Sequence, residues 1–445
     1  MMCALPQDGS RFLCMKIYRE TDEDYDVALS RMDRRAVPDR NVRETVEKII
    51  ADVEARGDEA LVDYAERFDH VHLTPDTLRV TDEELQEARA AVSDEVKAAI
   101  EASLHNIAYF SKNSMRQDWS GVNAQGCEVG ERFVPYRRVG IYVPAGKAPL
   151  VSSALMTGGF ALAVGVPEIV AVSPCGPDGK MNPALLYALQ EAGATEIYKV
   201  GGAQAVAALA LGTETIKPVE KIFGPGNRFV VEAKRQLVGA VSIDLLPGPS
   251  EVMVLADETA NPAFVAADLL AQAEHGPDSV IVMVTTSSSL LEKVEEEIEK
   301  QAATLNRGAY ICEVLDEHAF GFLVPTLKDG AKLANAFAPE HLVLVVNEED
   351  EEETLAGIHT AGAIYVGNYS TVACGDFLAG PSHTLPTGGS GKSFSGIRAD
   401  QFQRRTSIVR MDKAAAERSV PFVKVFAEVE GLDAHGRSLE LRAES

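Results

Sequence analysis

The chain has 445 residues, of which 46% are hydrophobic and 24% are charged, and its formal net charge is −25. This length suggests about two to four domains, and the composition argues against a chain that is disordered throughout. The acidic balance argues against nucleic acid and anionic membranes as partners, because their capture requires clustered Lys and Arg. It is compatible with a small cationic substrate, although it is equally typical of acidic enzymes in general.

The cysteines and the N-terminal residues indicate the cellular compartment in which the protein is expected. Six cysteines are scattered without a CxxC pair, which is typical of neither a disulfide framework nor a thiolate zinc site and indicates a reducing, cytoplasmic environment. Residues 1–14 contain no basic segment followed by an apolar core, and no apolar run reaches the ~20 residues of a membrane span. Met15 is a possible alternative start, so residues 1–14 carry little functional information.

The hydrophobic periodicity changes once along the chain. Residues 42–110 place apolar side chains at three- and four-residue steps, which predicts helices. From Arg138 onward, short apolar runs alternate with helical stretches, first over 139–223 and then over 251–366. Strands that alternate with helices in this way indicate βαβ crossovers and parallel sheets. The sequence therefore predicts two α/β domains, followed after about Asp400 by a helical tail that is broken at Pro421.

The nucleotide-binding signal is unusual. No GxGxxG fingerprint lies between a strand and a helix. Instead, glycine-rich turns follow three of the predicted strands: VPAGKAP (143–149), VGGAQAV (200–206) and FGPGN (223–227). Each turn taken singly is more typical of an ordinary βα connection. Together they favour an anion site, because glycine admits a ligand close to the backbone and a helix N-terminus follows.

A capped helix is predicted over 261–279. Asn261 and Pro262 are suited to its start, and Gly276 with Pro277 to its end. Gln272 and His275 lie three residues apart and hence on one face, near the negative end of the helix dipole, where a metal cation would be favoured. Gln is a poor zinc ligand, however, and a lone His at a helix end is more typical of a C-cap.

Further candidate groups come from distant segments. Glu340 and His341 stand at the entrance to the strand HLVLVV and are the commonest types of general acid and base, although a surface Glu beside a packed His is equally ordinary. Asp376 and His383 lie in a long Gly/Pro-rich loop, and His435 lies in the tail. A His/Asp/His set of this kind is able to complete a zinc shell, but ligands from separate segments leave no local pattern.

Read together, the motifs resemble the histidinol dehydrogenase family. The resemblance extends from about Val42 to Arg442 and rests on motifs that occur in family order: VGIYVPAGKAP, KVGGAQAVAALA, KIFGPGN, GPSEV, LLAQAEHGPDS, APEHL, GDFLAGPSHTLPTGG and EGLDAH. It implies the oxidation of L-histidinol, through L-histidinaldehyde, to L-histidine with two NAD+ in histidine biosynthesis.

The resemblance also implies roles for individual residues. Glu340 and His341 become the catalytic acid/base pair, and the cofactors are Zn2+ and NAD. The implied zinc ligands are Gln272, His275, Asp376 and His435. The implied NAD contacts are Tyr142, Gln204 and Asn227. The implied substrate contacts are Ser250, Gln272, His275, His341, Asp376, His383, Glu430 and His435.

The expected organisation follows from the periodicity and the resemblance together. The fold class is α/β, with two Rossmann-like parallel-sheet domains that lack the GxGxxG fingerprint, a small N-terminal segment and a helical C-terminal tail domain. The expected bounds are 1–27 for the N-terminal segment, 28–141 with 251–396 for the metal and catalytic domain, 142–250 for the NAD domain, and 397–445 for the tail. The implied assembly is a homodimer with shared active sites, in which the tail, and with it Glu430 and His435, reaches the partner.

Some positions depart from the family pattern and keep alternatives open. Ala145 stands where a second Gly is frequent, the helix SSALMTGGFALAVGV lacks a central Pro, and GGSGKSFSGIRADQF after His383 is unusual. One alternative is a paralogous zinc/NAD dehydrogenase of another small alcohol or a sulfonated diol. Another, from a different class, is a zinc-binding regulator without redox activity, which an intact Glu340–His341 pair disfavours.

Overall fold

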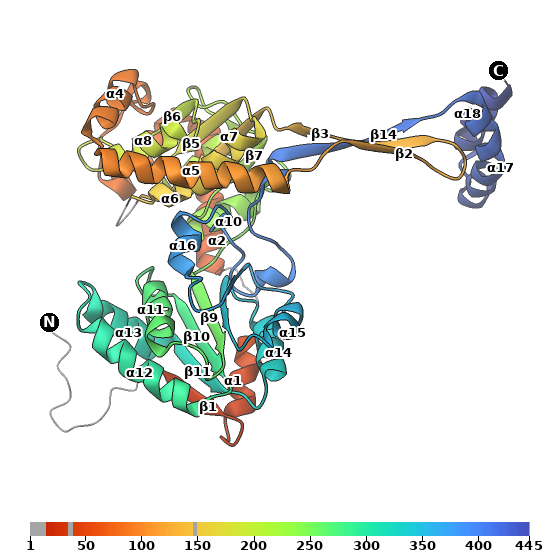
Figure 1. Cartoon of the computed structure of the whole chain (residues 1–445). Coiled ribbons are helices and arrows are strands. Elements are labelled where there is room, and N and C mark those ends of the chain that lie inside the picture. Colours follow the sequence, from red (N-terminus) through yellow and green to blue (C-terminus); the bar gives the residue numbers. More distant parts are fainter. Residues whose placement is uncertain (1–14, 34–38, 146–148, 445) are drawn as a thin grey trace.

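The computed structural model describes residues 15–33, 39–145 and 149–444. They form two lobes, each built on a parallel sheet, and a long arm that ends in a helical hairpin (Figure 1). The prediction of an α/β fold with parallel sheets and a helical C-terminus is therefore confirmed at this level. No described helix combines the length and the apolar character needed to cross a membrane.

The first lobe, here called the β4 lobe, contains a five-stranded parallel sheet. Its order is β6 (Glu196–Tyr198), β5 (Glu168–Val172), β4 (Arg138–Tyr142), β7 (Lys221–Phe223) and β8 (Ser242–Ile243). The helices of this lobe are α2 (Arg40–Arg56), α3 (Asp58–Tyr64), α4 (Asp82–Ala91), α5 (Asp94–Ser114), α6 (Val151–Ala154), α7 (Phe160–Val164), α8 (Pro183–Glu191), α9 (Gly202–Leu211) and α10 (Arg228–Leu237). Numbered by their position along the chain, the strands lie in the order 3-2-1-4-5.

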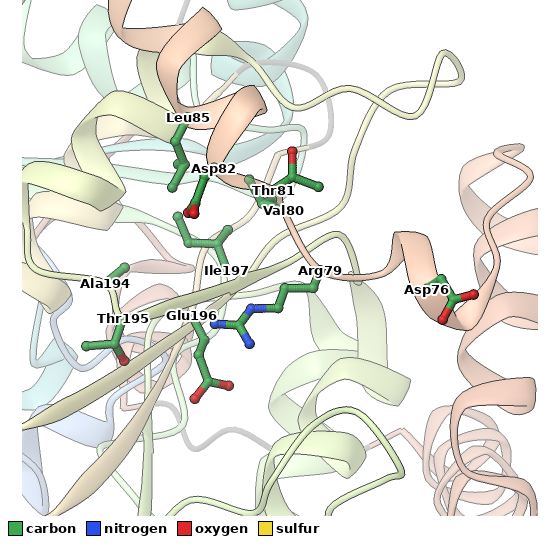
Figure 2. A pocket seen from close by; sticks show the side chains of 10 residues that line it. All are labelled: Asp76, Arg79, Val80, Thr81, Asp82, Leu85, Ala194, Thr195, Glu196 and Ile197. Atoms are coloured by element: carbon green, nitrogen blue, oxygen red, sulfur yellow. The ribbon is translucent and has the colours of Figure 1, made fainter.

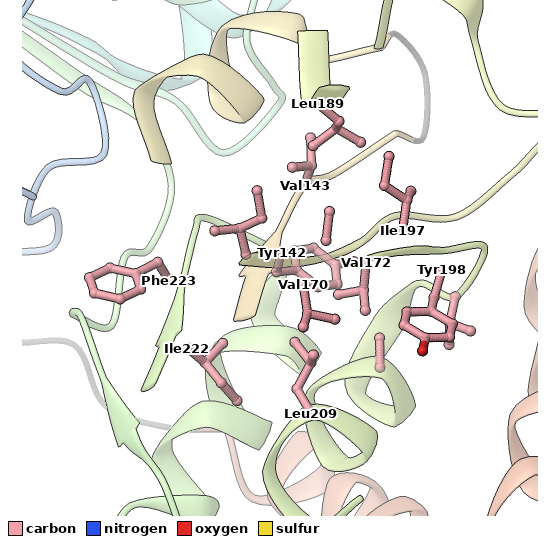
Figure 3. Close-up of a cluster of buried hydrophobic side chains, with 14 of the residues drawn as sticks. Tyr142, Val143, Val170, Val172, Leu189, Ile197, Tyr198, Leu209, Ile222 and Phe223 are labelled. Carbon is pink, nitrogen blue, oxygen red and sulfur yellow. The ribbon is translucent and has the colours of Figure 1, made fainter. Parts of the chain in front are cut away.

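A continuous apolar core fixes this sheet. The strand residues Val170 and Ile222 are fully buried on the face that Leu209 of α9 covers, and fully buried Phe223 points to the opposite face (Figure 3). The same core includes Val46 of α2 and Ile107 of α5. Burial of such side chains contributes about 1.5–3 kcal/mol each, so the N-terminal helices and the sheet form one folding unit.

The second lobe, here called the β9 lobe, contains a six-stranded parallel sheet. Its order is β1 (Lys16–Arg19), β11 (Ala319–Leu323), β10 (Val280–Thr285), β9 (Glu251–Ala256), β12 (His341–Val345) and β13 (Ala363–Val366). Its helices are α1 (Tyr25–Met32), α11 (Pro262–Ala273), α12 (Ser288–Ala302), α13 (Gly308–His318), α14 (Leu327–Phe337), α15 (Glu351–Ala356) and α16 (Val372–Phe377).

Helices cover both faces of the β9 sheet. Because successive strand side chains point to opposite faces, Val252 and Val254 join one core with α11, α12 and α13, while Met253 and Leu255 join another with α1 and α14. Strands buried on both faces read as nearly continuous apolar runs. This explains sequences such as EVMVLA and HLVLVV.

The domain bounds differ from those expected. Residues 28–141 were grouped with 251–396, but α2 packs on α9 and α10, and α5 packs on α7, so most of that segment belongs to the β4 lobe. Amphipathic periodicity predicts that a helix has a buried face without specifying which sheet buries it. The N-terminal segment also contributes more than expected, because β1 pairs with β11 at the edge of the β9 sheet.

The arm is a three-stranded antiparallel sheet that the periodicity did not predict. It consists of β2 (Trp119–Val122), β3 (Glu128–Pro135) and β14 (Gln403–Arg410), with β14 and β3 paired along their whole length. Its base is anchored in the β4 lobe, where buried Phe402 stacks on Phe223 with ring centroids 3.8 Å apart. The arm leads to α17 (Lys413–Glu430) and α18 (Asp433–Glu444), which pack on each other.

The expected break at Pro421 is wrong. The helix α17 continues through Pro421 and ends instead at Gly431, which adopts the left-handed conformation with φ 67°. A proline inside a helix removes one backbone hydrogen bond. Pro421 is exposed, so water is able to solvate the carbonyl that loses its partner.

A cluster of charges lies at the amino edge of the β4 sheet. The guanidinium of buried Arg138 donates to Glu168 at 2.7 Å and to Glu196 at 2.7 and 3.0 Å. The Tyr198 hydroxyl also donates to Glu196, at 2.7 Å. Glu196 and Arg79 line a pocket of about 350 Å³ beside α4 (Figure 2). The Arg138 hydrogen bonds, followed by that of Tyr198, lower the pKa of Glu196 to about 2 against the cost of burial.

We expect Glu196→Gln to lower the free energy of unfolding at pH 7 by about 2 kcal/mol, because it leaves a buried guanidinium with a weaker partner. The pKa of Glu196 is depressed in the folded state, so the stabilisation is present above the unfolded value of about 4.3 and is lost as the pH falls toward 2. Urea denaturation at several pH values between 7 and 3 measures this. The difference from the parent should shrink below about pH 4, and a pH-independent difference would contradict the assignment. Glu101→Gln, an exposed change on α5, is the control.

Candidate active site between the two sheets

Glu340 and His341 converge at the amino end of β12. Both are buried, with 7% and 4% of their surfaces exposed. The Glu340 carboxyl accepts the backbone N–H of Glu251 through Oε2 at 2.8 Å, and its Oε1 lies 3.9 Å from His341 Nε2. Ala338, which ends α14 in the left-handed region at φ 53°, turns the chain into this strand. Neighbouring residues on a regular strand would point apart, so this turn and the Glu251 hydrogen bond bring the pair together.

Burial controls the protonation of this pair. Desolvation raises the pKa of Glu340 well above its ordinary value, and the neighbouring Glu251 and Asp376 raise it further. Desolvation, followed by the charges of His383 and His275, lowers the pKa of His341 to about 3. At neutral pH the His341 imidazole is therefore uncharged, and burial favours the protonated form of the Glu340 carboxyl. An uncharged imidazole is a competent proton acceptor.

Asp376 extends the cluster from α16. Its Oδ1 lies 3.8 Å from His341 Nε2 and has no hydrogen-bond partner within the described part of the chain. Burial raises the pKa of Asp376 to about 7. A buried carboxylate without a partner is costly, and a cation bound beside it would remove that cost.

The helix that carries Gln272 begins as predicted but ends before the expected stop at Gly276 and Pro277. Asn261 accepts the N–H of Ala263, Pro262 is the first residue of α11, and the helix ends at Ala273. Gln272 is 2% exposed, and neither its Oε1 nor its Nε2 has a partner among the described residues. His275 lies just beyond the helix and is exposed, with Nδ1 3.2 Å from the Ala271 carbonyl oxygen.

His383 enters the site from the Gly/Pro-rich loop. Its Nε2 is buried without a partner in the described chain, and burial lowers its pKa to about 4. The loop is fixed to both lobes, since the Ser382 hydroxyl donates to the Met156 carbonyl at 3.0 Å and the Gly388 N–H donates to Glu251 at 2.9 Å. Thr387 further accepts the N–H of Gly248.

The three predicted nucleotide contacts lie at the carboxyl edge of the β4 sheet. Tyr142 ends β4, and its hydroxyl accepts the Gly202 N–H at 3.0 Å, while burial raises its pKa to about 12. Gln204 on α9 is 1% exposed, with Oε1 unpartnered among the described residues. Asn227 is exposed and accepts the N–H groups of Phe229 and Val230 at the start of α10. Residues 146–148 of the VPAGKAP turn lie outside the described residues.

A buried ion pair that the sequence analysis missed supports the FGPGN turn. Lys234 and Asp244 are both fully buried and in contact. Lys234 Nζ also donates to the Gly224 carbonyl at 3.0 Å, and the Gly224 N–H donates to Asp244 at 2.8 Å. Gly224 has φ 115°, and a Cβ there would lie 2.1 Å from the Tyr142 carbonyl oxygen. No local pattern linked Lys234 to Asp244, because the pairing depends on the packing of α10 against the sheet.

A pocket of about 860 Å³ is lined by candidate residues from both lobes. Asn227 and Arg228 line it from the β4 lobe, and Ser250 and His275 line it from the β9 lobe. The carboxyl edge of one sheet thus faces the same cavity as the amino edge of the other. This arrangement suits a reaction between a ligand bound on one side and a group transferred from the other.

Glu430 and His435 are not part of this cluster in the single chain. Both are exposed on the hairpin at the far end of the arm (Figure 1). Correspondingly, no three His, Cys, Asp or Glu side chains of the described residues converge as metal ligands. Of the expected zinc set, the structure places Gln272, His275 and Asp376 in the β9 lobe and leaves His435 apart.

Comparison with known proteins shows to which family the chain is related. A family model described as histidinol dehydrogenase matches residues 32–443. The histidinol dehydrogenase of Syntrophotalea carbinolica is 41% identical over 429 residues, covering 96% of this chain and 99% of its own. That of Bacillus subtilis is 42% identical over 400 residues, covering 90% and 93%. The chain belongs to the histidinol dehydrogenase family.

The fold agrees with this membership. The crystal structure of histidinol dehydrogenase from Elizabethkingia anophelis superimposes with a TM-score of 0.92 at 34% identity, covering 98% of this chain and 99% of that one. The histidinol dehydrogenase family consists of NAD-dependent oxidoreductases, and the predicted resemblance is therefore confirmed. Three of the motifs that carried it, KIFGPGN, GPSEV and LLAQAEHGPDS, contribute residues to the lining of the shared pocket.

Two further residues of this candidate site were not predicted from the sequence. Glu251 holds both Glu340, through its backbone N–H, and the Gly388 loop, through its carboxylate. Tyr365 of β13 places its hydroxyl 3.1 Å from His341 Nδ1. Glu251 stood inside the recognised GPSEV motif, whereas Tyr365 lies in an ordinary strand pattern that gave no signal.

Proposed function

We propose that this protein oxidises L-histidinol to L-histidine through the bound aldehyde, using two NAD+ and one water. The observation that carries the proposal is the buried cluster of Glu340, His341 and Asp376, with unpartnered Gln272 on the same lobe, beside a pocket shared with the nucleotide side. Family membership supplies the substrate. Each oxidation removes one hydride and one proton, and the water enters between the two steps.

The NAD site is proposed at the carboxyl edge of the β4 sheet. Its strand order 3-2-1-4-5 is that of a Rossmann-like sheet, in which ligands bind where the order reverses, here between β4 and β7. Tyr142 and the Gly224 turn meet at that point. We assign NAD contacts to Tyr142, Gln204 and Asn227; Asn227 uses its side-chain oxygen as a helix cap and keeps its amide donors for a ligand.

Zinc is proposed at the amino edge of the β9 sheet. Gln272, His275 and Asp376 would hold it, with His435 supplied by a second copy of the chain. The fit rests on the buried and unpartnered polar atoms of Gln272 and Asp376, which oxygen coordination would satisfy. Bound zinc would fix the amino and imidazole nitrogens of the substrate without redox chemistry. Ser250 and His383 would line the substrate from the same chain, and Glu430 from the second copy.

Neutral His341 is proposed to take the hydroxyl proton as hydride leaves the carbinol carbon. Glu340 then helps to activate water on the aldehyde, and His341 again accepts a proton as the second hydride leaves. Burial raises the pKa of Glu340 in the ligand-free site, and a positive charge nearby, such as a cation held at Asp376, would lower it toward the form that accepts a proton from water.

A homodimer is proposed because the helical hairpin at the end of the arm leaves apolar side chains uncovered in the single chain. Phe422, Val425, Phe426 and Val429 of α17 are 58–80% exposed, and their spacing places them on one helix face. An exposed apolar stripe of this kind marks an interface. A second copy would cover it and would bring His435 and Glu430 to a site that lacks them.

We expect the purified protein to form two NADH per L-histidinol and to contain about one zinc per chain. His275→Ala should lose both zinc and activity, because a coordinating nitrogen is removed. Absorbance at the NADH band and metal analysis measure these properties. His359→Ala, a change at another exposed histidine, is the control. Turnover of a sulfonated diol in preference to histidinol would contradict the substrate, and an active preparation without divalent metal would contradict the zinc site.

We expect His341→Asn to slow both oxidation steps while the zinc content is kept. Glu340→Gln should impair mainly the oxidation of L-histidinaldehyde, because that step requires activated water. General acid/base groups contribute about 100- to 10,000-fold. Single-turnover measurements with the alcohol and the aldehyde separate the steps. Equal impairment of both by Glu340→Gln would show that the division of roles is incorrect.

We expect two inactive variants, His435→Ala and His275→Ala, to complement each other after subunit exchange. In a two-fold heterodimer one site collects both defects, while the other combines an intact His275 with an intact incoming His435. Activity should reappear at up to about half of the parent value per heterodimer. Native mass spectrometry verifies the exchange. No recovery despite exchange would place His435 in its own chain's site or remove it from the ligand set.

A further inference from the structure

Tyr365 occupies a defined place beside the proposed base. It lies on β13, where its register partner on β12 is Val343. His341 is two residues from Val343 and therefore faces the same side of the sheet. The Tyr365 hydroxyl reaches diagonally across the strand pair to within 3.1 Å of His341 Nδ1, and the two rings lie 5.8 Å apart at a tilt of 38°.

The Tyr365 side chain also packs on the segment that carries Asp376. A Cβ added to Gly375 would lie 2.4 Å from both the hydroxyl oxygen and a ring carbon of Tyr365. Only a residue without a side chain allows α16 to approach the ring this closely. One phenol side chain thus contacts His341 on β12 and the residue next to Asp376 on α16.

The two nitrogens of His341 have different surroundings. Nδ1 meets Tyr365, whereas Nε2 faces Asp376 at 3.8 Å and Glu340 at 3.9 Å. Rotation of the ring by about 180° about the Cβ–Cγ bond would put Cδ2 in the place of Nδ1 and Cε1 in the place of Nε2, and such terminal torsions have two broad minima. The Tyr365 hydroxyl selects one of them, because it gives buried Nδ1 a hydrogen-bond partner.

We propose that Tyr365 is a positioning residue for the oxidation: its hydroxyl holds Nδ1 of His341 so that Nε2 faces the substrate side of the cluster. This role rests on the proposed function of His341 as the base. A phenol both donates and accepts hydrogen bonds. For Nε2 to act as the base, neutral His341 carries its own proton on Nδ1 and donates it to the Tyr365 hydroxyl oxygen. The same hydrogen bond persists after Nε2 has taken a proton from the substrate.

The test is Tyr365→Phe, which keeps the ring over Gly375 and removes only the hydroxyl. We expect kcat to fall roughly tenfold in both oxidation steps, about the equivalent of one hydrogen bond. The KM for L-histidinol, the zinc content and the melting temperature should stay at the values of the control Tyr369→Phe, which alters a tyrosine that is 89% exposed. An unchanged kcat, or a raised KM with lost zinc and an unchanged kcat, would overturn the proposal.

A second readout does not depend on turnover. With ¹⁵N-labelled histidine, the Nδ1 and Nε2 shifts of His341, assigned by comparison with His341→Asn, report the tautomer and the hydrogen bond at Nδ1. We expect these shifts to move in Tyr365→Phe and not in Tyr369→Phe. Unchanged shifts would overturn the positioning role. If the parent protein does not oxidise histidinol, the proposed function fails, and the shifts still decide whether Tyr365 holds His341.

Discussion

The site depends on the desolvation of acidic and basic groups where β9 and β12 begin. The backbone N–H of Glu251 satisfies one oxygen of the buried Glu340 carboxyl. Burial raises the pKa of that carboxyl and keeps His341 neutral, so burial disfavours an ion pair between the two side chains. The same burial makes the unpartnered polar atoms of Asp376 and Gln272 energetically costly unless a ligand or an ion binds them. A bound cation and substrate would supply the missing partners. The buried polar atoms that destabilise this edge of the sheet in the ligand-free protein would therefore favour the binding of a cation and substrate.

The two sheets have the same strand order, but their candidate site residues lie at opposite ends of the strands. Numbered along each lobe, both follow the order 3-2-1-4-5, with β1 added at one edge of the β9 sheet. The general preference for ligands at the carboxyl ends of parallel strands applies to the β4 sheet, where Tyr142 and the Gly224 turn lie. In the β9 sheet the polar cluster lies at the amino end. Because the two edges line one pocket, a hydride donor held by the second lobe would face an acceptor held by the first.

The sequence predicted local features well and long-range packing poorly. The start of α11 at Asn261 and Pro262, the alternation of strands and helices and the motif resemblance depend on neighbouring residues and are confirmed, whereas α11 ends at Ala273, before the stop expected at Gly276. The sharing of a core by α2 and the β4 sheet, the antiparallel arm and the Lys234–Asp244 pair depend on tertiary contacts that leave no periodic trace. Pro421 shows that local prediction can also fail within a helix. Proline propensity predicts a break there, but the packing of α17 on α18 overrides it. The roles proposed for the site residues come from family membership, because their spacing alone is equally compatible with ordinary structural roles such as a helix cap or a packed histidine.

The arm gives the proposed assembly a thermodynamic consequence. Its base is fixed in the β4 lobe by the stacking of Phe402 on Phe223, whereas its tip carries His435 away from the lobes of its own chain. Under the proposed arrangement a fourth zinc ligand exists only in the dimer. Whatever binds only the assembled state stabilises that state by mass action, so zinc and dimerisation would strengthen each other. The exposed apolar stripe on α17 would provide association energy that does not require the metal, and zinc would then add selectivity for the one register in which His435 reaches Gln272 and Asp376.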